Sequence, residues 1–173
     1  MAATCLSALG HVVGDSNVEV ERLGFVQDIM DRAQRQGVSL RIPTDVVIGQ
    51  SFDITTEPLN VQVTEIPTGW QIMDIGSVTT QAFIDELTIA NTIIWNGPMG
   101  VYEWPQYLKG TKTVAESLSR EDITSVIGGG STVDAVSSLG LEARMDHVST
   151  GGGASLEFLE GRDLPGIMSL MDV

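Results

Sequence analysis

The stretch "SVIGGGST", residues 125–132, decides the fold class, because an apolar strand passes through three glycines directly into a helix. "HVSTGGGASLEF", residues 147–158, repeats this design, and "IIWNGPMG", residues 93–100, is a related loop. Glycine permits positive φ and lets an anion approach backbone N–H groups closely. The helix that follows adds unsatisfied N–H groups and the positive end of its dipole. Such a loop is either a tight turn or a phosphate site without lysine, and two triple-glycine loops make these readings about equal.

Short apolar strands and amphipathic helices alternate on either side of these loops. Strands or short apolar segments are predicted at residues 38–43, 45–49, 91–95 and 122–127, helices at 17–36, 78–90, 110–119, 132–140 and 153–161, and loops with short strands at 52–76. Gly37 is placed to end the first helix. This alternation predicts an α/β domain with a largely parallel sheet.

The charge balance restricts the classes of ligand. Among 173 residues, nine Lys and Arg face 23 Asp and Glu, which gives a net charge of −14. The only lysines are Lys109 and Lys112. Such a chain should repel nucleic acid, anionic membranes and polyphosphates, unless backbone N–H groups, a metal ion or another chain supply positive charge. No apolar run is long enough to span a membrane.

The cysteine content and the start of the chain bear on the compartment. The single cysteine, Cys5, has no internal disulfide partner, and the first residues lack the basic region of a signal peptide. We therefore expect a reducing compartment, which is the cytoplasm or an organelle stroma or matrix.

Longer motifs resemble one family. They are "MAATCLSALGHVVGDS" (1–16), "LRIPTDVVIGQSF" (40–52), "MDIGS" (73–77), "WNGPMGVYE" (95–103), "KGTKTVAESL" (109–118), "IGGGSTVDAV" (127–136) and "HVSTGGGASLEFLEGRDLPGI" (147–167). In order and spacing they are similar to the C-terminal, nucleotide-binding domain of phosphoglycerate kinases. The resemblance covers nearly the whole chain. It implies a single partial domain over residues 1–173, Rossmann-like with three α/β/α layers and incomplete relative to the family domain.

The resemblance also implies an activity and its residues. The family transfers a phosphoryl group between ATP or ADP and 3-phosphoglycerate or 1,3-bisphosphoglycerate, in glycolysis or carbon fixation, with Mg²⁺. The implied nucleotide-binding residues are Met73 and Gly76 near the adenine, Asn96, Gly97 and Pro98 along the phosphates and ribose, Glu103 on the ribose hydroxyls, and Gly128, Gly129, Gly130 and Thr132 at the phosphates. Gly151, Gly152 and Gly153 would cradle the transferring phosphoryl group and are the implied catalytic residues. On the residues alone, Thr132 is equally a helix cap and Asn96 a turn residue.

One departure from the family pattern concerns the metal. Ser131 stands where the family has the aspartate that helps to hold magnesium. A hard cation prefers carboxylate oxygen over a neutral hydroxyl, so magnesium binding is doubtful. Asp134, one helical turn further on, is the alternative carboxylate.

Two further departures concern completeness. The family domain opens with a "GGAKVSDK"-like segment whose lysines reach the phosphates. Two core strands and the helix between them also precede the position that Met1 occupies, so the resemblance implies that these parts are missing here. The 3-phosphoglycerate domain is absent as well. We therefore expect this chain alone to be inactive, with a protein partner or a missing N-terminal portion completing it. The alternative is a non-catalytic, kinase-derived subunit with a structural or assembly role in a larger complex.

Overall fold

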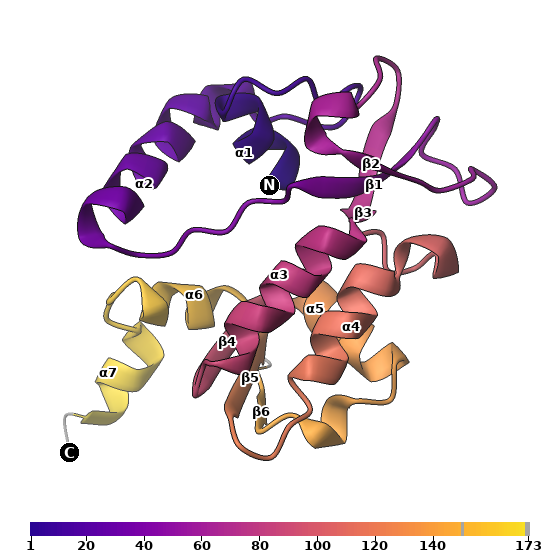
Figure 1. Cartoon of the computed structure of the whole chain (residues 1–173). Coiled ribbons are helices and arrows are strands. Elements are labelled where there is room, and N and C mark those ends of the chain that lie inside the picture. The colour runs from indigo at the N-terminus through magenta and orange to yellow at the C-terminus, as the bar shows by residue number, and fades with distance from the viewer. Residues whose placement is uncertain (150, 172–173) are drawn as a thin grey trace. The chain divides into compact units, whose positions relative to one another are not determined.

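The computed structural model describes residues 1–149 and 151–171, which fall into two compact units (Figure 1). Unit 1 comprises Met1–Glu86 and Met99–Val114, and unit 2 comprises Leu87–Pro98 and Ala115–Val173. That both belong to one partial domain stays a prediction. Of the helices in the described residues, none combines the length and apolar character that a bilayer crossing needs.

Unit 1 is built around an antiparallel sheet with strand order β2-β1-β3. Its elements are α1 (Ala2–Ala8), η1 (Val20–Arg22), α2 (Leu23–Gln36), β1 (Asp45–Gly49), β2 (Leu59–Gln62), η2 (Val63–Glu65), β3 (Gln71–Ile75), η3 (Pro105–Tyr107), and the first turns of α3 (Ser77–Thr88) and α4 (Lys109–Ser117). Leu6 of α1 packs with Val46 and Ile48 of β1 in a buried apolar cluster. This antiparallel sheet comes in addition to the parallel sheet that the sequence predicts.

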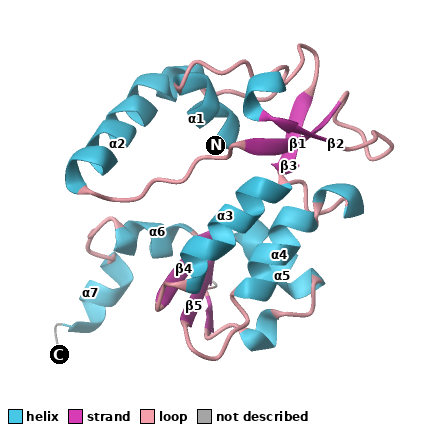
Figure 2. Cartoon of the chain, viewed as in Figure 1, coloured by secondary structure: helices cyan, strands magenta, loops and turns pink. Residues whose placement is uncertain are grey.

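Unit 2 contains the predicted parallel sheet, with strand order β4-β5-β6 and helices around it (Figure 2). Its elements are β4 (Thr92–Asn96), β5 (Thr124–Gly128), α5 (Gly130–Ser138), η4 (Glu142–Arg144), β6 (His147–Val148), α6 (Gly153–Leu159) and α7 (Pro165–Met171). Ile127 and Val136 are fully buried in its core. The α/β class is therefore confirmed.

The strand β4 lies at one edge of this sheet, because among the described residues it pairs only with β5. Ile93 and Trp95 are buried on one face, whereas Ile94 on the other face is 47% exposed. Parallel sheets normally have both faces covered, so the Ile94 face of β4 is unusually open.

Two sequence predictions are wrong. Residues 38–43 are irregular, with Val38 and Leu40 exposed, because no described strand lies beside them to pair with their backbone. The helix predicted at residues 17–36 begins only at Leu23. Before it, Val18 packs on the core of unit 1 and the amide of Glu19 donates to Oγ1 of Thr4 at 3.2 Å, which keeps that stretch out of the helix. The predicted end is confirmed, since Gly37 has φ of 68°.

Candidate functional site

The three glycine loops of unit 2 meet at one edge of its parallel sheet. Asn96, the last residue of β4, is in register with Gly128 at the end of β5, and Ile127 is in register with Val148 at the end of β6. The strands run in the same direction, so all three loops leave from their carboxyl ends. This edge is where ligands bind in open parallel α/β sheets.

The first loop turns at Gly97, which has φ of 104°. Its amide donates a 2.6 Å hydrogen bond to Oγ1 of Thr132, and its carbonyl accepts a 2.7 Å bond from Nε1 of Trp95. Thr132 is fully buried and makes no side-chain bond that caps its own helix. The hydroxyl that the sequence places at the phosphates therefore joins two loops in this structure, and Trp95 is a packing residue.

The second loop requires glycine for reasons of space. Gly129 precedes α5 with φ of 81°. A Cβ on Gly128 would lie 3.3 Å from Nδ2 of Asn96, and a Cβ on Gly129 would lie 3.1 Å from Oδ1 of the same side chain. The Asn96 amide therefore lies directly against the glycine backbone, which a larger residue would push away.

The start of α5 supplies free donors. The amides of Thr132 and Val133 both donate to the carbonyl of Gly129, at 3.1 and 3.0 Å. The amides of Gly130 and Ser131 find no acceptor within the described residues. First-turn N–H groups of this kind bind anions, because they carry the positive end of the helix dipole.

The third loop is partly closed by its own side chains. Oγ of Ser149 lies 2.6 Å from Oγ of Ser155 and accepts a 3.2 Å hydrogen bond from the amide of Gly151. Gly152, with φ of 47°, comes immediately before α6. Gly151 has therefore already used its donor, while Gly152 and Gly153 keep theirs available within the described part of the loop.

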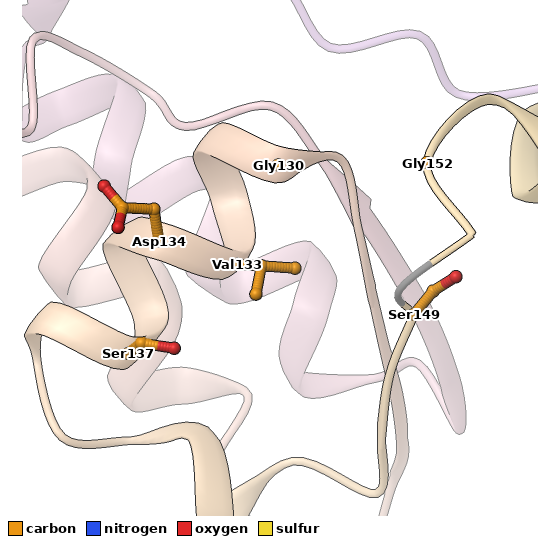
Figure 3. Close-up of a pocket in the computed structure, with 6 residues that line it drawn as sticks. All are labelled: Gly130, Val133, Asp134, Ser137, Ser149 and Gly152. Carbon is orange, nitrogen blue, oxygen red and sulfur yellow. The ribbon is translucent and has the colours of Figure 1, made fainter.

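A cavity of about 400 Å³ lies between α5 and the third loop. It is lined by Gly130, Val133, Asp134, Ser137, Ser149 and Gly152 (Figure 3). In this view the carboxylate of Asp134 points away from Gly152 and Ser149. In neither unit do three His, Cys, Asp or Glu side chains of the described residues come together to hold a metal ion. Asp134 is the one carboxylate among the residues that line this cavity.

Pro98 follows Gly97 in unit 2, whereas the predicted binding residues Met73, Gly76 and Glu103 lie in unit 1. Met73 and Gly76 are buried, and a Cβ on Gly76 would meet the Asp45 carboxylate at 2.1 Å. Glu103 is exposed in the loop before η3. Met73 thus has its side chain in the core, and only Glu103 presents a side chain to solvent.

Sequence reasoning missed Asp74, which lies inside the quoted "MDIGS" motif. Its side chain is 1% exposed, and it accepts 2.8 Å hydrogen bonds from the amides of Ile75 and Gly110. Burial raises the pKa of Asp74 to about 6, although both amide bonds oppose the rise. The available signal was a lone carboxylate in an apolar strand with no cation nearby in sequence.

A parallel α/β unit with glycine loops at adjacent strand ends is typical of α/β proteins that bind phosphorylated ligands. Comparison with known proteins identifies the family: a family model described as Phosphoglycerate kinase matches residues 1–162. The chain belongs to the phosphoglycerate kinase family.

Individual relatives agree with this assignment. Over 172 residues the chain is 46% identical to a phosphoglycerate kinase of Clostridium novyi. The aligned part makes up 99% of this chain and 43% of that protein. It is 45% identical to a cytosolic phosphoglycerate kinase of Nicotiana tabacum, covering 99% and 44%. The structure of phosphoglycerate kinase from Coxiella burnetii matches with a TM-score of 0.93 and 35% identity, covering 96% of this chain and 43% of that one. The chain thus spans less than half the length of these relatives.

Proposed function

We propose that this chain is the nucleotide-binding part of a phosphoglycerate kinase, and that it holds the phosphates of ATP or ADP through backbone amides. The free amides of Gly130 and Ser131 at the start of α5 carry this proposal. They lie at the carboxyl ends of parallel strands, next to the loops that contain Gly97 and Gly152. Backbone donors suit a chain with a net charge of −14, since they attract an anion without lysine.

We assign the remaining residues to different parts of the nucleotide. Asn96 and Thr132 set the shape of the phosphate loops, the first by packing on Gly128 and Gly129 and the second by bonding Gly97. Glu103 accepts hydrogen bonds from the ribose hydroxyls. Gly151, Gly152 and Gly153 cradle the phosphoryl group while it passes between the nucleotide and 3-phosphoglycerate. Phosphoryl transfer depends on positioning and on charge neutralisation. These residues supply only the nucleotide side of the reaction, not the 3-phosphoglycerate side.

The acceptor side comes from other polypeptide. The relatives have more than half of their length outside the match, and we propose that such a portion, or a partner chain, brings 3-phosphoglycerate and the missing cations. The whole reaction is the exchange of a phosphoryl group between ATP and 3-phosphoglycerate, a step of glycolysis or carbon fixation. The cytoplasm, or an organelle stroma or matrix, suits this role.

Isothermal titration calorimetry of the full chain with ADP tests the phosphate site. We expect binding that changes little when magnesium is added, because Ser131 offers a hydroxyl where a carboxylate would be needed. Ser131→Asp should make ADP binding depend on magnesium. Ser138→Asp adds the same charge at the far end of α5 and should not. Absence of ADP binding in the wild type would overturn the proposal.

A coupled assay tests the incompleteness of the chain. We expect no measurable transfer from ATP to 3-phosphoglycerate, whereas enzymes typically turn over at about 1–10³ s⁻¹. Turnover in that range would contradict the expectation. A purely structural or assembly role has no feature of the described residues in its favour beyond Ser131.

A further inference from the structure

A buried carboxylate in unit 1 is enclosed by main chain. Besides accepting the amides of Ile75 and Gly110, Asp74 lies so close to Gly100 and Gly110 that a Cβ on either would reach its Oδ1 at 2.5 or 2.4 Å. Two glycines thus leave room for one carboxylate. No described cation pairs with Asp74, so its ordering depends on the backbone amides alone.

The residue next to Gly110 carries the contact onward. Oγ1 of Thr111 is fully buried and accepts hydrogen bonds from the amides of Met99 and Gly100, at 3.0 and 3.4 Å. The carbonyl of Met73, adjacent to Asp74, accepts the amide of Val101 at 2.8 Å. The loop 99–101 is therefore bonded on one side to Thr111, the neighbour of Gly110, and on the other to Met73, the neighbour of Asp74.

We propose that Asp74 is a positioning residue, which fixes the first turn of α4 and, through Thr111, the loop 99–101 that leads into Glu103. Removing the carboxylate leaves the amide of Gly110 without an acceptor at the start of a helix. The first turn then loosens, and Thr111 moves with it. The placement of Glu103 on a ribose rests on the proposed function, but the connection from Asp74 to the loop does not.

Asparagine cannot replace this carboxylate. Oδ1 accepts from Ile75 and Oδ2 accepts from Gly110, so both oxygens face N–H donors. The amide group of asparagine would turn its own NH₂ toward one of them. Asp74→Asn therefore preserves volume and removes one acceptor, which is the smallest change that breaks the clamp.

Hydrogen exchange on the full chain tests the connection. In Asp74→Asn we expect faster exchange at Gly110 and also at Met99 and Gly100, neither of which bonds to Asp74. Asp146→Asn is the control, because the exposed Asp146 also accepts a backbone amide, that of Ser125 at 2.8 Å, in unit 2. It should leave the loop unchanged. Faster exchange at Gly110 alone would overturn the proposal.

Nucleotide binding tests the consequence. ADP and 2′,3′-dideoxy-ADP differ only in the ribose hydroxyls, which would donate hydrogen bonds to the carboxylate of Glu103. Asp74→Asn should weaken ADP about tenfold, the loss typical of one hydrogen bond to a charged group, and leave dideoxy-ADP unchanged. Glu103→Gln should show the same selective loss with normal exchange in the loop. Equal weakening of both nucleotides would mean a general structural role and would overturn the proposal.

The experiments separate a failure of nucleotide binding from a failure of the variant to fold. If the wild type binds neither nucleotide, the proposed function fails, and hydrogen exchange alone decides the role of Asp74. If Asp74→Asn does not fold, Thr111→Val breaks the same route one step later while keeping a β-branched shape. It should reproduce the faster exchange at Met99 and Gly100, and unchanged exchange there would refute the route.

Discussion

The amide of Gly97 donates a 2.6 Å hydrogen bond to Oγ1 of Thr132, across 35 residues of sequence. This bond joins the loop after β4 to the first turn of α5. It also engages the amide of Gly97 and the hydroxyl of Thr132, two groups that the family resemblance places at the phosphates. The helix-capping alternative for Thr132 does not hold either, because Gly129 precedes α5 and no side chain caps it. The shape of these two glycine loops therefore depends on a fully buried threonine.

Replacing Thr132 by valine should destabilise the protein by about 1–3 kcal/mol, since the partly buried amide of Gly97 loses its acceptor while the volume is kept. Urea unfolding followed by tryptophan fluorescence measures the loss, because Trp95 bonds to the carbonyl of Gly97. Thr132→Ser keeps the hydroxyl and should lose less. A serine variant as unstable as the valine variant would show that the methyl group, and not the bond, matters.

Gly129→Ala should lower the stability by about 1–2 kcal/mol, because φ of 81° disfavours any Cβ and Asn96 lies 3.1 Å from where it would be. Gly130 is the natural comparison, since it has an ordinary φ and open space around its Cβ position. Gly130→Ala should be neutral or stabilising, as alanine favours a helix. Thermal unfolding of both variants measures the contrast. Equal melting temperatures would contradict the account of Gly129.

The free energy of unfolding should fall as the pH rises through the titration of Asp74, because burial of the ionised carboxylate costs more than the hydrogen bonds from the amides of Gly110 and Ile75 return. Burial raises its pKa from 3.8 to about 6, so the folded chain holds this proton more tightly than the unfolded chain. The decrease takes place between about pH 4 and 6, and two pKa units correspond to about 3 kcal/mol. Urea unfolding of the wild type and Asp74→Asn across this range measures it.

The comparison with Asp74→Asn is needed because other carboxylates act in the opposite direction. Burial favours a higher pKa for Asp45, but hydrogen bonds from Thr79, Val78 and Asn60 outweigh it and hold the pKa below the ordinary value. Its contribution is lost as the pH falls. The difference between wild type and variant therefore isolates Asp74, and a difference that does not change with pH would refute the shifted titration.

The edge strand β4 should make the chain associate with itself. Residues 92–96 are uncharged, lack proline and include Ile94 with 47% exposure, which are features of an unprotected edge. Ile94→Lys should shift the sedimentation profile toward monomer. Ile89→Lys, at a position 80% exposed and outside the strand, is the matched control. If both lysines act alike, added charge rather than the edge explains the change.

Local patterns allowed much of this fold to be predicted. The strand-glycine-helix design around Gly128 sets β5 and α5 within a few residues, and the glycines appear where backbone must lie against Asn96. What failed depends on distant partners. Residues 38–43 have the composition of a strand, yet a strand needs a neighbour that composition does not reveal. The bonds of Thr132 to Gly97 and of Asp74 to Gly110 likewise join residues 35 and 36 apart, so no local pattern shows them.

Because the donors at Gly130 and Ser131 belong to the main chain, they are insensitive to most mutations that a lineage accumulates. Almost every point mutation leaves an amide N–H in place, because proline alone deletes it. Accumulated mutations therefore remove side chains that coordinate metals or form ion pairs more readily than they remove N–H groups that can bind an anion. A relative that has lost its carboxylates and lysines would therefore still present these two amides to an anion.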